Sequence, residues 1–350
     1  MADWADMGDS SGHTRVASRD DSIFGPAEYL AHLVDICGRF HVRPEQLLKG
    51  TGVKPSTFER PSAVVSKASS MRVVERALAL TSEPGLGFYW GLSLKLSSHG
   101  PLGLLAMTSG TLRDAIMVAE RFMQLRASEL ALRTHQAEGA LVIEFHNQVP
   151  AHLRVFFSEA MFIMLLHVGR ALVGHPIAAR CELPFAEPAH FRRFAHLMPD
   201  DVRFGGTVNR LFIPTALLDE AVLTSDSVMA RRAERECQRE LDELRARASF
   251  LSTLRRHLSP ERGDFPSLEE LAERTHSSTR TIKRKLALQG QSYRKLVDEL
   301  RRDRATELLT ASDLPLEKIA AQLGYSDTAS LHRSFRRWFK CTPEAYRQRR

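Results

Sequence analysis

Residues 319–340 read IAAQLGYSDTASLHRSFRRWFK and decide the fold of the C-terminal part of the chain. A helix over the second half would place Leu331, Phe335 and Phe339 on one apolar stripe, because these residues recur every four positions. Gly324 follows the last apolar residue of an earlier amphipathic segment, where a left-handed cap favours glycine. The stretch therefore predicts two short helices joined by a tight turn, with a basic outer face on the second helix.

This arrangement is typical of a helix-turn-helix that binds DNA. Ser326 or Asp327 can cap the second helix by accepting a hydrogen bond from one of its free amides. The alternative is a solvated basic helix on the surface of any domain, and this stretch alone does not decide between the two.

The same pattern occurs a second time upstream, which a solvated helix does not require. Residues 268–286, LEELAERTHSSTRTIKRKL, parallel residues 316–335, LEKIAAQLGYSDTASLHRSF. The apolar positions match at an offset of 48 before the turn and of 49 after it, so that one residue is inserted in the turn. Insertions are tolerated best in such connections. We therefore expect two helix-turn-helix units in tandem.

Between the two units, residues 292–311 predict an amphipathic linker helix. Roughly 20 residues at about 1.5 Å each give about 30 Å. Major-groove faces on one side of DNA repeat at about 34 Å. A linker of this length can place two recognition helices in adjacent major grooves.

The charge of the chain is concentrated in the same region. The chain has 350 residues, of which 43% are apolar and 26% charged, as in globular proteins large enough for two domains. Residues 251–350 hold 21 Lys and Arg against 13 Asp and Glu, whereas the rest of the chain holds 28 against 29. A basic C-terminal domain indicates a polyanionic partner, and double-stranded DNA is the leading candidate.

The N-terminal part predicts a mixed α/β domain. Residues 28–127 are mainly helical in pattern, and residues 128–147 predict two strands around a turn, with Leu141, Ile143 and Phe145 on one face. A buried helix over 152–173 and further strand-like pieces follow. The fold class expected is mainly α, with a mixed α/β N-terminal domain and an all-α C-terminal domain. The expected parts are a disordered tail over 1–22, an α/β domain over 23–224, a connecting helix over 225–248 and a DNA-binding domain over 249–350.

The connecting helix carries apolar residues at heptad spacing. Cys237, Leu241, Leu244 and Ala248 recur at steps of four, three and four. Such a run fits either the seam of a homodimer or a helix packed within its own chain. We predict a dimer with these four residues near its seam, and the second interpretation stays open.

The sequence does not support a disulfide-bonded, metal-binding, secreted or membrane-spanning protein. The four cysteines, Cys37, Cys181, Cys237 and Cys341, form no CxxC pair and have no histidine at ligand spacing, so we expect reduced thiols, no metal site and no cofactor. The acidic N-terminus does not resemble a signal peptide. Glu159, His167 and Arg170 interrupt the apolar stretch 155–174, which predicts a core helix and not a membrane span. A cytoplasmic location is expected.

Enzyme motifs are also weak. GDSSG at 8–12 fits the pattern of a nucleophile elbow, but such an elbow follows a strand, and the seven residues before this motif do not have the pattern expected of one. GLGFYWG at 85–91 lacks the final spacing of a dinucleotide fingerprint and is expected to begin a helix. We therefore expect that the protein is not an enzyme.

The C-terminal hundred residues resemble the AraC/XylS family of bacterial transcription regulators. The similarity is carried by IAAQLGYSD, SFRRW, TPEAYR, SSTRTIKRKL and LRRDRATELL. Lys340 stands where the family usually has Gly, and Arg336 where it usually has Lys. GPLGLLAMTSGTLRDAI and VRFGGTVNRLFIPTALLD also resemble the arabinose-binding-type sensor domain of one branch of the family.

This resemblance implies a DNA-binding regulator that is controlled by a small organic effector and contacts RNA polymerase. The alternative is a constitutive regulator whose N-terminal domain serves only oligomerisation or protein contacts. By resemblance, DNA contacts come from seven residues: Arg280, Lys283, Arg284, Thr328, Ala329, His332 and Arg333. Four further arginines are expected to bind phosphates or to form salt bridges: Arg301, Arg302, Arg336 and Arg337.

Overall fold

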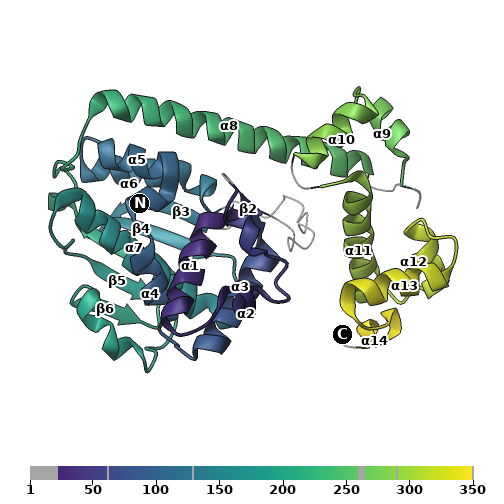
Figure 1. The fold of residues 1–350 in the computed structure, drawn as a ribbon, viewed down its shortest axis with the longest axis horizontal. Coiled ribbons are helices and arrows are strands. Elements are labelled where there is room, and N and C mark those ends of the chain that lie inside the picture. The colour runs from purple at the N-terminus through teal and green to yellow at the C-terminus, as the bar shows by residue number, and fades with distance from the viewer. Residues whose placement is uncertain (1–22, 61–62, 128–129, 259–264, 289–290, 349–350) are drawn as a thin grey trace, which may run out of the picture. The chain divides into compact units, whose positions relative to one another are not determined.

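The computed structural model describes residues 23–60, 63–127, 130–258, 265–288 and 291–348 (Figure 1). The chain forms two compact units that divide between Asp242 and Glu243, within one long helix. The tail over 1–22 that we expected to be disordered lies outside the described residues.

The N-terminal unit combines helices with a five-stranded sheet. Its helices are α1 Ala27–Arg39, α2 Pro44–Leu48, α3 Lys67–Thr81, α4 Leu86–Ser93, α5 Gly100–Thr108, α6 Leu112–Phe122 and α7 Arg154–Val173, with the short 3-10 helix η3 Met123–Leu125 after α6. The sheet strands are β3 Leu130–Ala137, β4 Ala140–Asn147, β5 Arg180–Leu183, β6 Asp201–Phe204 and β7 Asn209–Pro214. A separate pair, β1 Ile23–Pro26 and β2 Val64–Ser66, was not expected from the sequence.

The sheet has the strand order β3-β4-β7-β5-β6, in which only β5 and β6 run parallel. The predicted hairpin is confirmed, because β3 and β4 pair antiparallel through the turn at Glu138 and Gly139. Leu141, Ile143 and Phe145 all point into the core, as their alternation predicts. The mixed α/β character expected of this domain is therefore confirmed.

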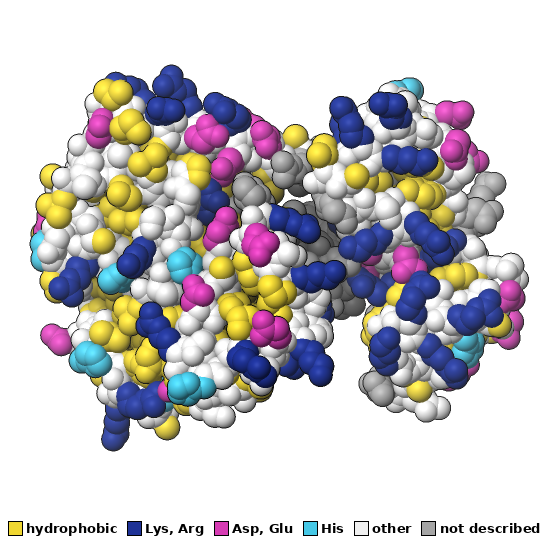
Figure 2. Space-filling view, viewed as in Figure 1, with side chains coloured by type: hydrophobic (Ala, Val, Ile, Leu, Met, Phe, Trp, Pro, Cys, Tyr) yellow, Lys and Arg dark blue, Asp and Glu magenta, His cyan; other side chains and the backbone are white. Residues whose placement is uncertain are grey.

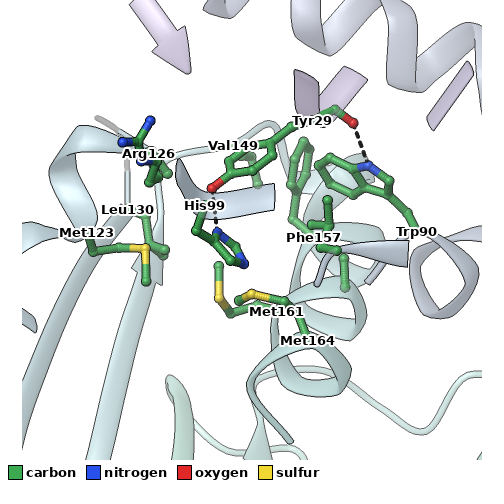
Figure 3. A pocket seen from close by; sticks show the side chains of 13 residues that line it. Tyr29, Trp90, His99, Met123, Arg126, Leu130, Val149, Phe157, Met161 and Met164 are labelled. Atoms are coloured by element: carbon green, nitrogen blue, oxygen red, sulfur yellow. Dashed lines mark hydrogen bonds between the residues drawn. The ribbon is translucent and has the colours of Figure 1, made fainter. Parts of the chain in front are cut away.

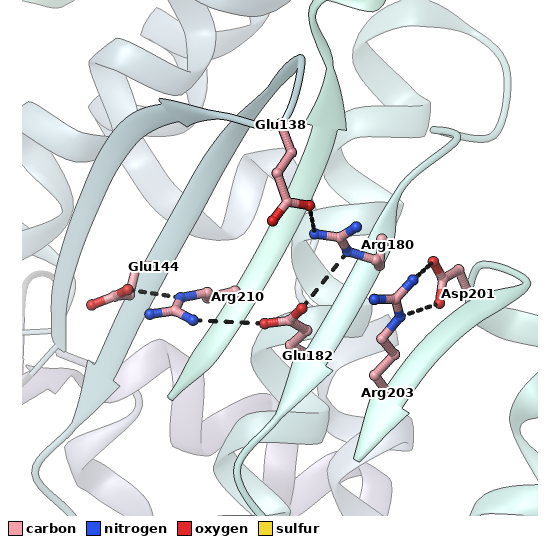
Figure 4. Close-up of polar contacts among 7 residues, drawn as sticks. All are labelled: Glu138, Glu144, Arg180, Glu182, Asp201, Arg203 and Arg210. Atoms are coloured by element: carbon pink, nitrogen blue, oxygen red, sulfur yellow. Dashed lines mark hydrogen bonds and ion pairs between the residues drawn. The ribbon is translucent and has the colours of Figure 1, made fainter. Parts of the chain in front are cut away.

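The opposite face of the sheet carries a row of ion pairs (Figure 4). Arg210 on β7 lies between Glu144 on β4, at 3.0 Å, and Glu182 on β5, at 3.7 Å. Arg180 reaches Glu138 at 2.7 Å and stacks on the Phe212 ring, 3.7 Å from its centroid. Charged side chains thus cover the second face of the sheet.

Helix α7 is the central core helix. Phe162 and Ile163 pack toward the sheet, whereas Phe156 and Met164 pack against the N-terminal helices. By length and composition, residues 151–173 could cross a membrane, but 61% of the apolar window is buried inside this unit. The prediction of a buried helix here is confirmed.

The long helix α8, Ser227–Leu258, corrects the predicted dimer seam. Cys237 and Leu241 are fully buried against Leu102, Leu105 and Phe122 of α5 and α6 in the same chain. These two residues therefore cannot form a seam, and the intrachain interpretation of the heptad pattern applies to them. Leu244 is half-buried, and the side chain of Ala248 lies outside the described residues.

The C-terminal unit is all helical in its described residues. After the end of α8 it contains α9 Leu268–Arg274, α10 Thr279–Ala287, α11 Tyr293–Ala311, α12 Leu316–Gln322, α13 Thr328–Phe339 and α14 Pro343–Arg347. Its apolar side chains form two small cores, one around α9 and α10 and the other around α12 and α13. Helix α11 contributes Leu296 and Val297 to the first core and Leu308 and Leu309 to the second, so it is the linker helix that the sequence predicts.

Candidate DNA interface

The first helix-turn-helix unit consists of α9 and α10. Ser267 and Glu270 form a capping box at the start of α9, with each side chain accepting the other residue's backbone amide, at 3.1 and 2.6 Å. On α10, Ile282 and Leu286 are fully buried and fix which face of the helix points outward. The expected DNA contacts of this unit lie exposed on that outer face: Arg280, Lys283 and Arg284.

The second unit consists of α12 and α13. The Asp327 carboxylate accepts the Ser330 amide at 2.6 Å, and this hydrogen bond lowers the pKa of Asp327. Leu331 and Phe335 are fully buried, and the Phe335 ring packs tilted against Phe339 and edge-on against Tyr346. The predicted apolar stripe is confirmed, and it turns the opposite face of α13 outward. Ala329, Arg333 and Arg336 are exposed there, while Thr328 and His332 are half-buried.

The turns of the two units have the same backbone structure. Gly324 adopts a left-handed φ of 69°, and the amides of Gly324 and Tyr325 bond back to the carbonyls of Ala321 and Ala320, both at 3.0 Å. In the first unit His276 takes this position, with a φ of 47° and equivalent bonds. The cap residues Ser278 and Asp327 stand 49 apart, whereas His276 and Gly324 stand 48 apart. The inserted residue therefore lies in the turn, as the repeat predicts.

The candidate DNA contacts differ in how their side chains are held. The side chains of four of them make no hydrogen bond or ion pair with any other described residue: Arg280, Lys283, Arg284 and Arg336. Arg333 donates to Ser330 Oγ at 2.8 Å, and His332 Nε2 lies 3.2 Å from Glu344 Oε1. Because these side chains form few or no hydrogen bonds and ion pairs within the protein, they are available to a ligand.

Arg337 is tied into the fold more firmly. Its guanidinium forms an ion pair with Asp298 on α11, and the Trp338 indole donates to the second oxygen of the same carboxylate at 2.9 Å. Of the two roles expected for Arg337, phosphate contact or salt bridge, the structure contains the salt bridge.

Arg301 has a structural role that the sequence did not specify. It donates to the carbonyls of Leu323 and Gly324, at 2.9 and 3.2 Å, and so caps the end of α12. Its guanidinium also lies about 5 Å from the ring centroids of Phe265 and Tyr325. Because two of its three nitrogens are engaged in the turn, Arg301 positions the backbone between α12 and α13.

The visible face of the C-terminal unit presents many Lys and Arg side chains (Figure 2). A basic surface attracts phosphates irrespective of sequence, and base edges are read only by side chains that enter a groove. Arginine can form a bidentate contact with guanine, and the Thr methyl or Ala side chain can pack on thymine.

The N-terminal unit contains a partly open cavity of about 80 Å³ (Figure 3). Tyr29, Trp90 and Phe157 supply aromatic walls, and the Tyr29 hydroxyl bonds to His99 Nδ1 at 2.6 Å. Arg126 carries the one formal charge among its lining residues. The sequence did not single out Tyr29, His99 or Arg126, because they come from separate segments that only the fold brings together.

A chain that joins a cavity-containing α/β domain to two tandem helix-turn-helix units is a DNA-binding transcription regulator by class. Residues 42–222 match the family model for the arabinose-binding N-terminal domain of AraC transcription regulators, and residues 271–349 match that of a helix-turn-helix domain. The chain belongs to the AraC family, as its resemblance predicts.

Relatives match it over nearly their whole length. An ornithine utilization regulator of Pseudomonas aeruginosa is 29% identical over 325 residues, which cover 92% of this chain and 96% of that protein. The HTH-type transcriptional regulator VirS of Mycobacterium tuberculosis is 24% identical over 318 residues, covering 89% and 93%. The solved structure of the regulator CdpR from P. aeruginosa is 22% identical, with a TM-score of 0.46, and covers 92% and 98%.

Proposed function

We propose that this protein regulates transcription by placing α10 and α13 in two adjacent major grooves of its target DNA, under the control of a small organic effector bound in the N-terminal domain. The observation that carries the proposal is the repeated geometry of the two units. Both recognition helices have a side-chain cap, a buried apolar stripe and an outward basic face. Helix α11, which joins them, has 19 residues and a length of about 28 Å.

Within this proposal the exposed side chains divide by role. Arg280, Lys283 and Arg284 contact DNA from α10. Thr328, Ala329, His332 and Arg333 do so from α13, where Thr328 and Ala329 offer apolar contact to a thymine methyl. Arg336 binds phosphate, whereas Arg337 chiefly holds α13 against α11 through Asp298.

Control by an effector is supported by the cavity. A regulator whose N-terminal domain served only oligomerisation would need no internal space, whereas ligand sites combine apolar walls with a few polar groups. The similarity to an ornithine utilization regulator makes amino acids and their derivatives one sensible group of test compounds.

Three further parts of the proposal follow from the family resemblance. The protein acts in the bacterial cytoplasm, contacts RNA polymerase, and has no enzymatic activity.

A fourth part, which the heptad spacing on α8 suggested, is a homodimer, whose interface must avoid Cys237 and Leu241. Sedimentation at micromolar concentration tests the dimer, and a monomer would contradict it.

The proposal is tested by selecting DNA sites from random sequence with the full-length protein. Fluorescence anisotropy then measures affinity for the selected site, alone and with acids, amines, amino acids and sugars. We expect selection of one extended site and a change in DNA affinity with one group of compounds. Failure to enrich any sequence, or an affinity that no compound changes, would contradict DNA recognition or effector control, respectively.

A further inference from the structure

We propose that the cavity beside Arg126 binds a small, largely apolar carboxylic acid, and that Arg126 communicates its presence to helix α8 through Glu240. This inference rests on the proposed effector control and goes further by naming the chemical class of the ligand and the contact that responds to it.

The size and walls of the cavity limit the ligand. A space of about 80 Å³ holds on the order of six non-hydrogen atoms, if each atom takes the room of one water. Most of the lining is apolar: Trp90, Leu94, Met123, Ala127, Leu130, Val149, Phe157, Ala160, Met161 and Met164. A short hydrocarbon chain fits such walls, whereas a sugar would leave its hydroxyl groups unpaired.

His99 offers an unused hydrogen-bond donor at this cavity. Its side chain is only 8% exposed, and its Nε2 has no partner among the described residues. Burial lowers the pKa of His99 to about 4, so the imidazole is neutral at pH 7. When the Tyr29 hydroxyl donates to Nδ1, the proton of the neutral ring lies on Nε2. Figure 3 shows this imidazole between Tyr29 and the two methionines, Met161 and Met164.

Arg126 supplies a second unused donor and the positive charge. Its Nη2 donates to Glu240 Oε2 at 2.8 Å, but its Nε is buried without a partner among the described residues. Arg126 is the one charged group among the lining residues, and its unpaired Nε favours an acceptor with negative charge, such as a carboxylate. No acidic side chain lines the cavity, so nothing there would balance the charge of an amine.

The segment from Phe122 to Ala127, which includes Arg126, contacts both the cavity and α8. Met123 and Ala127 line the cavity, whereas Phe122 and Leu125 pack against the α8 residues that include Leu241. Glu240 directly precedes Leu241. A carboxylate next to Arg126 competes with Glu240 for the guanidinium and weakens the ion pair that holds α8 at this point. Helix α8 then continues to Leu254 and Leu258, which form part of the core of the first helix-turn-helix unit.

Another internal space, beneath the sheet, is a weaker candidate. It is lined by aliphatic side chains such as Leu112, Leu166 and Ile213 and offers no polar side chain to orient a ligand. The cavity at Arg126 is therefore the one that the chemistry favours.

The test uses the full-length protein with butanoate and hexanoate, each compared with its primary amide and primary amine. Titration calorimetry gives the affinity, and Trp90 in the cavity wall provides a fluorescence signal. We expect the acids to bind about tenfold or more tightly than the amides, and the amines not to bind, because charge-assisted hydrogen bonds are the strong ones. Arg126→Gln should weaken binding of the acid by about tenfold or more, and Arg126→Lys should restore part of it.

Arg121 provides a matched control. It also ties α6 to α8, through Glu234 at 2.6 Å and Gln238 at 2.9 Å, but it does not line the cavity. Arg121→Gln should therefore leave affinity for the acid unchanged. Glu240→Gln should keep or raise that affinity while abolishing the effect of the acid on DNA binding, measured on the selected site.

The outcomes separate this inference from the proposed function. Amines or amides that bind more tightly than acids, or an Arg126→Gln variant with unchanged affinity, would overturn the inference and leave effector control intact. Acids that bind through Arg126 but do not alter DNA affinity would overturn the link to α8. If no compound in the broader panel alters DNA affinity, the proposed effector control fails as well.

Discussion

At the scale of single residues, two side chains among the described residues of the C-terminal unit occupy backbone positions that favour glycine. His276 ends α9 with a φ of 47°, and Lys340 ends α13 with a φ of 58°. A side chain in this left-handed region strains the backbone by about 1–2 kcal/mol. The Schellman turn of the first unit was hidden in the sequence because His276 stands where the second unit has Gly324. Lys340 adopts the left-handed conformation at a position where the family usually has Gly.

Replacing Lys340 with Gly should stabilise the C-terminal domain by about 1 kcal/mol. Glycine removes the backbone strain, and this gain exceeds the cost of the greater conformational entropy that glycine gives the unfolded chain. Thermal unfolding followed by circular dichroism measures this change. Lys340→Ala is the control, since it removes the charge and keeps the strain, and it should not stabilise. Equal stabilisation by both variants would mean that charge, and not backbone conformation, is responsible.

Glu159 is a buried acid in the core helix α7. Its side chain is 2% exposed, and burial, aided by the nearby Glu83 charge, raises its pKa to about 9. Burial also lowers the pKa of its partner His190, whose Nε2 lies 2.6 Å from Glu159 Oε1. Both shifts describe a neutral pair in which the protonated carboxyl donates to the imidazole.

The stability contributed by this pair should therefore decrease as the pH rises from about 6.5 to about 9. In this window the folded state holds a proton on Glu159 that the unfolded state has released, at a cost of about 1.4 kcal/mol per pH unit. Below about pH 6.5 the unfolded state carries a proton on His190 instead, so the two terms offset each other. Glu159→Gln should remove this dependence and raise the melting temperature most at high pH. Parallel curves for the two proteins across this window would contradict the neutral pair.

Arg336 and Arg337 are adjacent and exposed, but only Arg337 has an acidic partner among the described residues, Asp298. Arg336→Ala should weaken binding to all DNA sequences alike and reduce the salt slope by about one. Arg337→Ala should change that slope less and lower thermal stability instead. Anisotropy titrations at several salt concentrations measure both, and a larger slope change for Arg337→Ala would reverse the assignment.

At the scale of helices and strands, close packing of α4 on α7 organises the N-terminal core. A Cβ on Gly91 would lie 2.4 Å from the Ala160 carbonyl oxygen and 2.3 Å from Ile163 Cγ2. The segment GLGFYWG thus begins a helix, as predicted, and its glycines allow the two backbones to approach. The helical pattern was visible in the sequence, but the need for small residues depends on the partner helix.

Gly91→Ala should destabilise this domain by several kcal/mol, because a backbone carbonyl cannot move aside cheaply. Gly38 in α1 is the matched control, since a Cβ there would meet nothing within 4 Å. Gly38→Ala should stabilise by about 0.5–1 kcal/mol, from helix propensity alone. Thermal melts of both variants decide the matter, and a Gly91→Ala protein as stable as the native one would contradict the packing.

Periodicity determined what could be predicted of these elements. Apolar residues recur at helical spacing in the helix pair around Gly324 and at alternate positions in strand β4. These elements could therefore be predicted from the sequence. The heptad run on α8 was ambiguous, because a seam and an intrachain contact require the same spacing. Cys237 and Leu241 pack against helices of their own chain, and this contact becomes visible only in the folded structure. The cavity was not predictable for a similar reason, since Tyr29, His99 and Arg126 are distant in sequence.

At the scale of the whole molecule, the chain joins an arabinose-binding-type domain to a C-terminal domain with two helix-turn-helix units. The family and fold class followed from sequence, since tandem motifs and charge concentration are local features. The ion pair of Arg337 and the capping role of Arg301 depend on α11, so a list of basic residues could not separate them from DNA contacts. The repeat places Arg284 and Arg333 at equivalent positions, which is the basis of the central claim.

Footprinting of the full-length protein on its selected site tests that claim most directly. We predict two protected major-groove segments on one face of the DNA, about one helical turn apart. Arg284→Ala and Arg333→Ala, each folded by circular dichroism, should cost about 1–3 kcal/mol and relax base preference in different segments. Protection confined to a single groove, or a folded Arg333→Ala protein with unchanged sequence preference, would contradict the account.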